Sequence, residues 1–538
     1  MKELKAYSIL FNPRKNKGMA FSNAERKKYG LLGILPDEIE TIDTQMIRVH
    51  EQLSNFDKPI DKYIYLTSLL DINETLFYKT IIDDPAKYLP LVYTPTVGEA
   101  CQRLGHIARR PRGLFISIKN KKKIKILLKN WPVKDIRFVV VTDGQRILGL
   151  GDLGIFGIGI PIGKLALYTA CSGVPPEYTL PIVLDAGTDN KMFLSDPLYP
   201  GIKKSRVKGK EYDDFIQSFV KAITKVFPRV CIQWEDFAGV NALRILDKYR
   251  DKVCTFNDDI QGTAAIALAG FISAGRMLNK PFKDQRFLFL GAGAAAFGIA
   301  DLILKKFEKD GISKNDALDN IWMFDVNGLL VSSRTDLAVH QKLFAHDAEP
   351  INDFAETILK IKPTAIIGVS TVGGAFNRKV IENMSSINER PIIFPYSNPT
   401  SHSECTAEQA YTWSNGKAIF ASGSPFAPVI YDGKTFIPGQ GNNVFIFPAV
   451  GMAVFATEAK RVTDNMFITA AEAVAEQITE EDFNNGLIYP PVKNIRNASI
   501  NVAVKVAEEI FNSGLARVKK PKNIRKFIMA KMYEPVYK

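Results

Sequence analysis

The sequence has few cysteines, and none of them is closely paired with another. Five cysteines occur in 538 residues, and no two form a CxxC motif. An odd number cannot pair completely, and thiolate metal sites usually need closely spaced pairs. We therefore disfavour a disulfide framework and a metal–thiolate centre, and interpret the thiols as reduced and buried in a cytoplasmic protein. The cysteines are Cys101, Cys171, Cys231, Cys254 and Cys405.

Long hydrophobic runs are also missing. The longest nearly apolar runs, 262–275 and 444–456, have about 14 and 13 residues, whereas a membrane-spanning helix needs about 20. The first residues place charges around a very short apolar patch, which is not the pattern of a signal-peptide core. No internal repeat indicates a solenoid. We expect no membrane among the partners.

The composition is that of a large globular protein. Hydrophobic residues make up 46% of the chain and aromatic residues 10%, which is enough to fill sizeable cores. Lysine and arginine number 70 against 57 acidic residues, giving a net charge of +13. This modest excess favours solubility and attraction of small anions. The basic runs 119–125 and 519–526 leave a nucleic-acid-binding protein as an alternative.

From about residue 136 onward, short β-branched runs alternate with helical stretches. The alternation predicts an α/β fold with doubly wound parallel sheets, which bind ligands at the carboxyl ends of their strands. Residues 21–90 have helical patterns, and a helix is expected within 36–53. The predicted strands are 137–142, 178–184, 229–234, 287–290, 320–324, 365–369 and 391–394, and further helices are predicted at 164–171, 213–226, 463–478 and 497–511.

A glycine turn follows the predicted strand 287–290 and opens a helical pattern. In this GxGxxA sequence, Gly291 permits the tight turn, Gly293 lets the backbone approach a pyrophosphate, and Ala296 allows close packing of helix on strand. Asp325 follows the next strand, where a carboxylate can accept hydrogen bonds from an adenine ribose. The pattern predicts a dinucleotide site, and the acid favours NAD over NADP because it repels a 2′-phosphate.

Pairs of adjacent acids follow two strand-like runs. Glu235 and Asp236 lie between two aromatic residues. Asp258 and Asp259 lie between Phe256 and an isoleucine. Burying such acids without compensation costs several kcal/mol, and Mg²⁺ or Mn²⁺ with its preference for oxygen ligands would relieve that cost. The alternative is a solvated acidic loop or a cap for a helix over 262–274.

Two further residues are ambiguous when considered alone. Lys164 follows a glycine-rich stretch and enters an apolar segment, where it is either a helix residue with its amine in solvent or a desolvated base. Tyr93 follows the apolar, strand-like run 88–92, and a tyrosine in such a place is more often a packed ring than an acid. Arg146 lies in a turn between these regions.

Taken together, these motifs resemble the malic enzyme family in its NAD-dependent, bacterial-type form. They follow the family's order and spacing and cover the chain from about residue 18 to about 510. The matching segments are YTPTVG at 93–98, VTDGQRILGLGD at 141–152, GIPIGKL at 159–165, WEDF at 234–237, FNDDIQGT at 256–263, GAGAAA at 291–296, SNPT at 397–400 and GNN at 441–443.

The resemblance implies a role for each matching residue. The implied metal ligands are Glu235, Asp236 and Asp259. The implied catalytic residues are Lys164 as general base, Tyr93 as general acid, and Asp258, which orients the lysine. The implied substrate contacts are Arg146, Asn398 and Asn443. The implied dinucleotide contacts are Arg146, Asp259, Gly291, Gly293, Ala294, Ala296, Asp325 and Asn398.

The implied activity is NAD- and divalent-metal-dependent oxidative decarboxylation of L-malate to pyruvate and CO₂, with Mn²⁺ or Mg²⁺ as the metal, and decarboxylation of oxaloacetate. Malolactic enzyme, a relative that converts malate to lactate while retaining its cofactor, is the alternative. An interface site for fumarate, which some members build from two arginines, is not expected, because Ile72 stands where one arginine would be.

The resemblance also implies an architecture. A Rossmann-type NAD-binding domain is expected to be inserted beside a central α/β domain, with a helical N-terminal domain, in a homodimer or homotetramer. The expected parts are 1–112 (helical, with Tyr93), 113–257 (central, with substrate and metal sites), 258–443 (NAD-binding), 444–515 (completing the central domain) and 516–538 (basic tail).

Overall fold

The computed structural model describes residues 5–107 and 110–538, and the chain divides into two compact units. The first unit comprises Met1–Phe237, Val492–Arg496 and Arg525–Lys538. The second comprises Ala238–Pro491 and Asn497–Ile524. C-terminal segments therefore contribute to both units.

The N-terminal part of the first unit is helical, as predicted. Ser22 caps helix α2 (Asn23–Tyr29) in a capping box with Glu25. Helix α3 (Ile42–Ser54) begins after Thr41 rather than near residue 36, because the Thr41 hydroxyl accepts a hydrogen bond from the Thr44 N–H at 3.1 Å. The other helices here are α1 (Lys5–Leu10), α4 (Pro59–Ile72), α5 (Glu74–Asp83), α7 (Thr96–Gln102) and α8 (Leu104–Ile107).

The strand-like interpretation of residues 88–92 is wrong, because they complete helix α6 (Pro85–Val92). Pro85 occupies the first turn, where a missing N–H leaves no hydrogen bond unmade, and the Asp84 carboxylate accepts a hydrogen bond from the Lys87 N–H at 3.1 Å. A short apolar run fits either element, and here the cap and the proline favour the helix.

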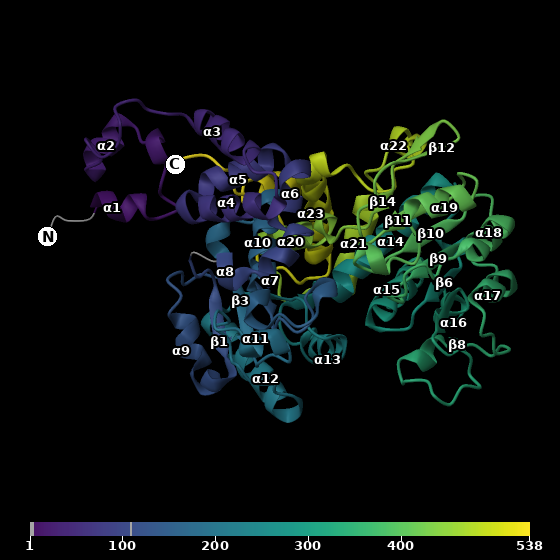
Figure 1. The fold of residues 1–538 in the computed structure, drawn as a ribbon. Coiled ribbons are helices and arrows are strands. Elements are labelled where there is room, and N and C mark those ends of the chain that lie inside the picture. Colours follow the sequence, from purple (N-terminus) through teal and green to yellow (C-terminus); the bar gives the residue numbers. More distant parts are fainter. Residues whose placement is uncertain (1–4, 108–109) are drawn as a thin grey trace. The chain divides into compact units, whose positions relative to one another are not determined.

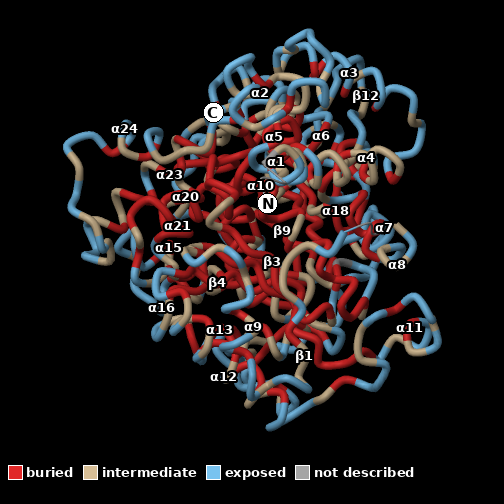
Figure 2. The backbone as a smooth tube through the Cα atoms, turned by 90° about the vertical axis from the view of Figure 1, so that its left-hand side faces the viewer, coloured by how far each residue is buried: buried red, intermediate tan, exposed pale blue. Residues whose placement is uncertain are grey.

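The sheet of the first unit is parallel and has the order β1-β3-β2-β4. Every residue of β2, β3 and β4 is buried, as expected for strands covered on both faces, and Figure 2 shows β3 and β4 in the colour of buried residues. The strands are β1 (Leu114–Ser117), β2 (Phe138–Thr142), β3 (Thr179–Asp185) and β4 (Cys231–Trp234), and the helices of this region are α9 (Ile124–Lys129), α10 (Gly159–Ser172), α11 (Lys191–Ser195) and α12 (Gly209–Val226).

Helices α10 and α12 cover this sheet through aromatic contacts. The rings of Tyr168 on α10 and Phe138 on β2 lie 4.4 Å apart, and those of Phe219 on α12 and Trp234 on β4 lie 6.1 Å apart. Residues 154–172, which end with α10, are long and apolar enough to span a membrane, with a mean hydropathy of 1.4. Because 94% of that stretch is buried inside the protein, its apolar character is explained by its place in the core.

The second unit contains a seven-stranded sheet with the order β14-β11-β10-β9-β6-β7-β8 (Figure 1). All its pairings are parallel except that of β7 with β8. The strands are β6 (Phe287–Leu290), β7 (Ile321–Asp325), β8 (Gly328–Leu329), β9 (Ala365–Gly368), β10 (Ile392–Pro395), β11 (Ile419–Ser422) and β14 (Gly439–Gln440); β5 (Thr255–Asn257) and the hairpin β12 (Val429–Tyr431) and β13 (Lys434–Phe436) also belong to this unit.

Helices cover both faces of this sheet, which makes it doubly wound. Leu288 on β6 belongs to a core cluster with residues of α17 (Phe354–Ile361), α18 (Arg378–Ile387) and α19 (Ala407–Trp413). Phe287, one residue earlier, instead contacts Phe271 of α14 (Thr263–Met277) at 5.0 Å. The remaining helices are α13 (Gly239–Tyr249), α15 (Ala294–Lys309), α16 (Lys314–Leu318), α20 (Phe447–Thr457), α21 (Asp464–Ala475), α22 (Glu480–Asn484), α23 (Ile495–Asn512) and α24 (Ile524–Met529). The predicted fold class is confirmed.

The five cysteines are free and buried, as predicted. Burial raises the pKa of the Cys171 thiol to about 12 and the pKa of the Cys101 thiol beyond that. Thiols held neutral in this way are poor nucleophiles and poor metal ligands, which favours a packing role for Cys101 and Cys171.

Candidate active site

Lys164 lies inside the first unit with its amine turned toward polar partners. The residue is 2% exposed, and its Nζ lies 3.0 Å from Oε1 of Glu235. The same amine lies 5.4 Å from the centre of the Tyr93 ring. An amine that reached solvent would be exposed, so the structure excludes the interpretation of Lys164 as a helix residue with a solvated head.

Helix α10 allows Tyr93 to approach Lys164 because it has a glycine at position 163. A Cβ atom at Gly163 would lie 2.9 Å from both Cδ2 of Tyr93 and the carbonyl oxygen of Val92. Tyr93 itself ends helix α6, where its N–H donates to the Leu89 carbonyl at 2.9 Å. The next peptide bond, Thr94–Pro95, is cis.

Glu235 is buried at the carboxyl end of β4 and is held by its neighbours. Gln233, two residues earlier on the same strand, donates from Nε2 to Oε2 of Glu235 at 2.7 Å. The Tyr168 hydroxyl donates in turn to the Gln233 side-chain oxygen. The hydrogen bond from Gln233 occupies Oε2 of Glu235, and Oε1 of the same carboxylate faces Lys164. The lysine and the carboxylate therefore form a fixed buried pair. Sequence analysis missed Gln233, which looks like an ordinary strand residue.

Asp236 adopts a left-handed backbone conformation directly after Glu235. Its φ is +58°, and its carbonyl oxygen accepts a hydrogen bond from the Arg146 N–H at 3.1 Å. Asp236 is 5% exposed, which excludes the solvated acidic loop as an explanation of this pair. Arg146 has an exposed side chain, so the guanidinium that the sequence assigns to substrate is accessible from solvent.

In the second unit, Asp258 and Asp259 lie in a π-helical turn, Asp258–Gly262, that precedes α14. A helix cap was the alternative to a metal site for this segment. The cap of the turn is Asn257, whose side chain accepts a hydrogen bond from the Ile260 N–H at 3.0 Å. Asp258 is fully buried, and Asn443 donates from Nδ2 to its Oδ2 at 3.1 Å. The structure thus brings Asp258 and Asn443 together, 185 residues apart in sequence. Turns of this π type often occur at functional sites.

The glycine turn after β6 has the geometry that a dinucleotide site needs. Gly291 has φ +114°, and a Cβ there would lie 2.6 Å from the carbonyl oxygen of Val369. A Cβ at Gly293 would meet nothing within 4 Å, so the backbone is open to a ligand at that point. Helix α15 starts at Ala294, and Ala296 is fully buried. Free N–H groups at such a helix start bind phosphate oxygens.

Asp325 ends β7 and pairs with an arginine. Arg334 donates from Nη1 to Oδ1 of Asp325 at 2.8 Å and from Nη2 to Oδ2 at 2.9 Å. The same guanidinium is bonded to Asp336. The charge of Asp325 is evident in the sequence, but its pairing with Arg334, nine residues further along the chain, is not.

Asn398 and its surroundings form a polar cluster at the ends of β9 and β10. The Ser424 hydroxyl donates to the side-chain oxygen of Asn398 at 2.5 Å, and the Asn398–Pro399 peptide bond is cis. Glu404, fully buried, accepts hydrogen bonds from the hydroxyls of Ser397 at 2.6 Å and Ser370 at 2.8 Å. Glu404 joins the loops that follow both strands, and no motif in the sequence marked it.

Each unit therefore holds its own subset of the predicted residues. The first unit contains Tyr93, Arg146, Lys164, Glu235 and Asp236. The second contains Asp258, Asp259, Gly291, Gly293, Ala294, Ala296, Asp325, Asn398 and Asn443. In both units most of these residues lie at or after the carboxyl ends of strands, where doubly wound sheets bind ligands, whereas Tyr93 ends helix α6 and Lys164 lies in helix α10.

A doubly wound sheet with an open glycine turn is typical of dinucleotide-binding proteins. Family comparison then gives the particular group: residues 70–250 match the family "Malic enzyme, N-terminal domain", and residues 260–511 match "Malic enzyme, NAD binding domain". The chain belongs to the malic enzyme family.

Individual relatives agree with this assignment. The chain is 50% identical over 536 residues to a protein named NADP-dependent malic enzyme from Vitis vinifera, covering 99% of this chain and 91% of that one. The chain is also 47% identical over 536 residues to a protein named NADP-dependent malic enzyme from Anas platyrhynchos, and the match covers 99% of this chain and 96% of that one. Among solved structures, the malic enzyme of Pyrococcus horikoshii is 26% identical with a TM-score of 0.56, covering 83% of this chain and 89% of that one. The malic enzyme of Entamoeba histolytica, which is 23% identical, shares the fold with a TM-score of 0.59, and the match covers 93% of this chain and 90% of that one.

The prediction of a cytoplasmic protein is wrong by this comparison. A Mus musculus relative that is 48% identical is named mitochondrial, and an Arabidopsis thaliana relative that is 49% identical is named chloroplastic. The prediction rests on free, buried cysteines, which are typical of reducing compartments in general and do not distinguish one from another.

Proposed function

We propose that the chain oxidatively decarboxylates L-malate to pyruvate and CO₂ with a nicotinamide dinucleotide and a divalent cation, and that it also decarboxylates oxaloacetate. The observation that carries the proposal is the buried amine of Lys164, 3.0 Å from Glu235 and beside the ring of Tyr93. A base, a carboxylate ligand and an acid in one place are what this reaction needs.

The chain's own residues would carry the proton transfers. Lys164 in its neutral form accepts the proton of the C2 hydroxyl, and Tyr93 protonates C3 after CO₂ has left. Arg146 holds a carboxylate of the substrate through paired hydrogen bonds, and Asp258 orients the lysine. The bound dinucleotide would take up the hydride and the bound cation would polarise the C2 oxygen.

The donor set in the first unit fits a hard divalent cation. Glu235 and Asp236 offer carboxylate oxygens from adjacent buried positions, and Mg²⁺ and Mn²⁺ both prefer such ligands. We propose Asp259 as the third ligand. Nothing in this donor chemistry separates the two metals, so either is expected to support turnover.

We propose NADP as the dinucleotide, in place of the NAD expected from sequence. The expectation of NAD rested on the negative charge of Asp325. Arg334, which is shared with Asp336, offsets part of that charge through two hydrogen bonds of 2.8 and 2.9 Å to Asp325, and an arginine near this position favours a 2′-phosphate. The relatives named NADP-dependent also support this choice.

Arg334→Gln is expected to lower kcat/KM for NADP⁺ by about tenfold, which corresponds to about 1.4 kcal/mol, while changing kcat/KM for NAD⁺ by less than about threefold. The reason is that only NADP⁺ carries the extra phosphate that the guanidinium attracts. Steady-state kinetics with both dinucleotides measure the ratio. Arg378→Gln, an exposed arginine of the same unit that pairs with Glu382, is the matched control. Equal losses for both dinucleotides would mean that Arg334 has only a structural role.

Gly293→Ala is expected to weaken dinucleotide binding by about tenfold or more with little change in thermal stability. The added methyl meets no protein atom within 4 Å but occupies the approach of the pyrophosphate. Gly291→Ala should in addition lower the melting temperature, because its Cβ collides with the Val369 carbonyl. Fluorescence titration with NADPH and thermal melts distinguish the two. An unaltered dissociation constant for Gly293→Ala would place the pyrophosphate elsewhere.

The product assay tests the reaction itself. With malate, Mn²⁺ and each dinucleotide in turn, we expect reduced dinucleotide, pyruvate and CO₂ in equal amounts. Lactate formed without reduced dinucleotide would assign the chain to malolactic activity instead. No turnover, together with salt-dependent binding of an oligonucleotide, would favour the nucleic-acid alternative.

The division into five parts, 1–112, 113–257, 258–443, 444–515 and 516–538, stays a proposal, as does assembly into a homodimer or homotetramer. Light scattering of the purified protein measures the assembly, and the mass of a monomer would contradict it.

A further inference from the structure

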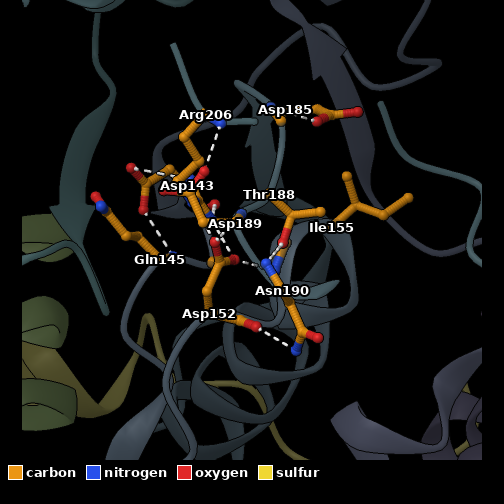
Figure 3. Close-up of polar contacts among 12 residues, drawn as sticks. Asp143, Gln145, Asp152, Ile155, Asp185, Thr188, Asp189, Asn190 and Arg206 are labelled. Atoms are coloured by element: carbon orange, nitrogen blue, oxygen red, sulfur yellow. Dashed lines mark hydrogen bonds and ion pairs between the residues drawn. The ribbon is translucent and has the colours of Figure 1, made fainter. Parts of the chain in front are cut away.

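A buried charged network lies beneath the turn that carries Arg146, and Arg206 is its centre (Figure 3). The Arg206 side chain is 2% exposed. Its Nε and Nη2 donate to the two carboxylate oxygens of Asp152, each at 2.7 Å, and Nη2 also donates to the carbonyl oxygen of Asp143 at 2.9 Å. Nη1 lies 3.7 Å from the Asp143 carboxylate. One guanidinium therefore contacts two aspartates that are nine residues apart.

Further hydrogen bonds hold Asp143 and Asp152 in position beside Arg206. The Tyr212 hydroxyl donates to Oδ2 of Asp143 at 2.6 Å. The Asp189 N–H donates to Oδ2 of Asp152 at 2.7 Å, and the Arg206 N–H donates to the Asp189 carboxylate at 3.0 Å. Although burial works to raise it, the Arg206 guanidinium holds the pKa of Asp152 below its ordinary value. Hydrogen bonds from three separate segments therefore hold the two aspartates at the base of the turn.

The segment between the two aspartates, residues 143–152, is here called the Arg146 loop. It closes on itself through a hydrogen bond of 2.8 Å from the Ile147 N–H to the Gly151 carbonyl. The Gly144 carbonyl, at its start, accepts a hydrogen bond of 2.9 Å from the Leu153 N–H, just past its end. The two ends of the Arg146 loop are therefore held to each other by backbone hydrogen bonds.

The Arg146 loop also fixes Asp236. The Arg146 N–H donates to the Asp236 carbonyl at 3.1 Å, so the loop that presents the arginine also holds the backbone of a proposed metal ligand. Displacement of the loop would shift both the guanidinium of Arg146 and the carboxylate of Asp236. The buried network and the substrate-facing residues are thus mechanically connected.

We propose that Arg206 is a positioning residue for substrate binding, which acts by holding the Arg146 loop closed at Asp143 and Asp152. This inference rests on the proposed function, because it takes Arg146 to bind a carboxylate of malate. A guanidinium suits this role because it makes two parallel bonds to one carboxylate while reaching a second group. A lysine ammonium is a single point charge and cannot form two parallel bonds from separate nitrogens to Asp152.

A double-mutant cycle tests the proposal with the full-length protein. Its corners are the wild type, Arg206→Lys, Arg146→Ala and the double variant. Arg206→Lys is expected to raise the malate KM about tenfold while kcat falls less than about threefold, and Arg146→Ala to raise it about 100-fold. The double variant should be no worse than Arg146→Ala alone, because residues that act through one another are not additive.

Controls separate positioning from general damage. Arg137→Lys changes an arginine at the opposite end of β2 that also bonds one aspartate twice, Asp135, at 3.1 and 3.0 Å, and should leave malate KM unchanged. The dissociation constant for NADPH should be the same in Arg206→Lys as in the wild type, because Arg206 lies in the first unit and the dinucleotide turn lies in the second. If Arg206→Lys does not fold, Asp152→Asn weakens the same contact without removing the buried cation.

The outcomes are distinct. Additive effects of Arg206→Lys and Arg146→Ala on malate affinity, or equal losses for malate and NADPH, would overturn the positioning role. The cycle is read from malate affinity, measured as KM and by calorimetry, so it holds whether the product is pyruvate or lactate. Failure of the product assay therefore overturns the proposed reaction, and failure of the cycle overturns the role of Arg206.

Discussion

Lys164→Ala is expected to lower kcat for malate oxidation by about 10²–10⁴-fold, the range that a positioned general base or acid contributes. The buried amine is the basic group 3.0 Å from Glu235, and alanine leaves no group there to accept the hydroxyl proton. NADPH binding should be unchanged, because the glycine turn belongs to the other unit. Stopped-flow or steady-state rates, together with fluorescence titration of NADPH, measure both quantities.

Removal of a buried lysine also leaves its carboxylate partner uncompensated, which costs stability. Lys306→Ala is the matched control, because Lys306 is 8% exposed and its Nζ lies 3.2 Å from Glu472. Both variants should melt at lower temperature, but only Lys164→Ala should lose turnover. Wild-type turnover by Lys164→Ala would remove the lysine from the mechanism.

Strands β2, β3, β4, β6, β7, β9 and β10 could be predicted from sequence because their patterns agree with their final environment, whereas β1, β8, β11 and β14 were not predicted. The run 287–290 is apolar throughout, is bounded by a glycine turn, and becomes β6 with the predicted ends. The run 88–92 has a similar composition but forms helix α6, because the Asp84 cap and Pro85 lie before it. Composition alone cannot separate a short buried strand from a buried helix turn.

The candidate site was predictable where adjacent residues carry the chemistry and not where distant residues support it. Glu235 and Asp236 are conspicuous because two acids stand together among aromatic residues. Arg206 and Glu404 are not, because each belongs to an unremarkable segment and gains its role from partners that the fold brings near. Asp325 illustrates the same limit, since its charge is visible in the sequence but its pairing with Arg334 is visible only in the structure.

Asp236→Asn is expected to weaken Mn²⁺ binding by on the order of 100-fold, or about 2.7 kcal/mol, because it removes one of the negative charges that attract the cation. The substitution is well suited to the site. Asparagine tolerates the left-handed conformation at φ +58°, and the backbone carbonyl that accepts the Arg146 N–H is retained. The loss is therefore expected in metal affinity rather than in folding.

Calorimetry and the electron paramagnetic resonance of free Mn²⁺ measure that affinity without relying on turnover. Asp432→Asn makes the same change at another aspartate with positive φ, +48°, in the turn between β12 and β13, and should leave the Mn²⁺ titration and the melting temperature as in the wild type. Saturating Mn²⁺ should restore part of the lost activity of Asp236→Asn, since weaker binding is overcome by mass action. An Mn²⁺ titration identical to that of the wild type would exclude Asp236 as a ligand. A lower melting temperature with unchanged affinity would reduce its role to holding the Arg146 loop.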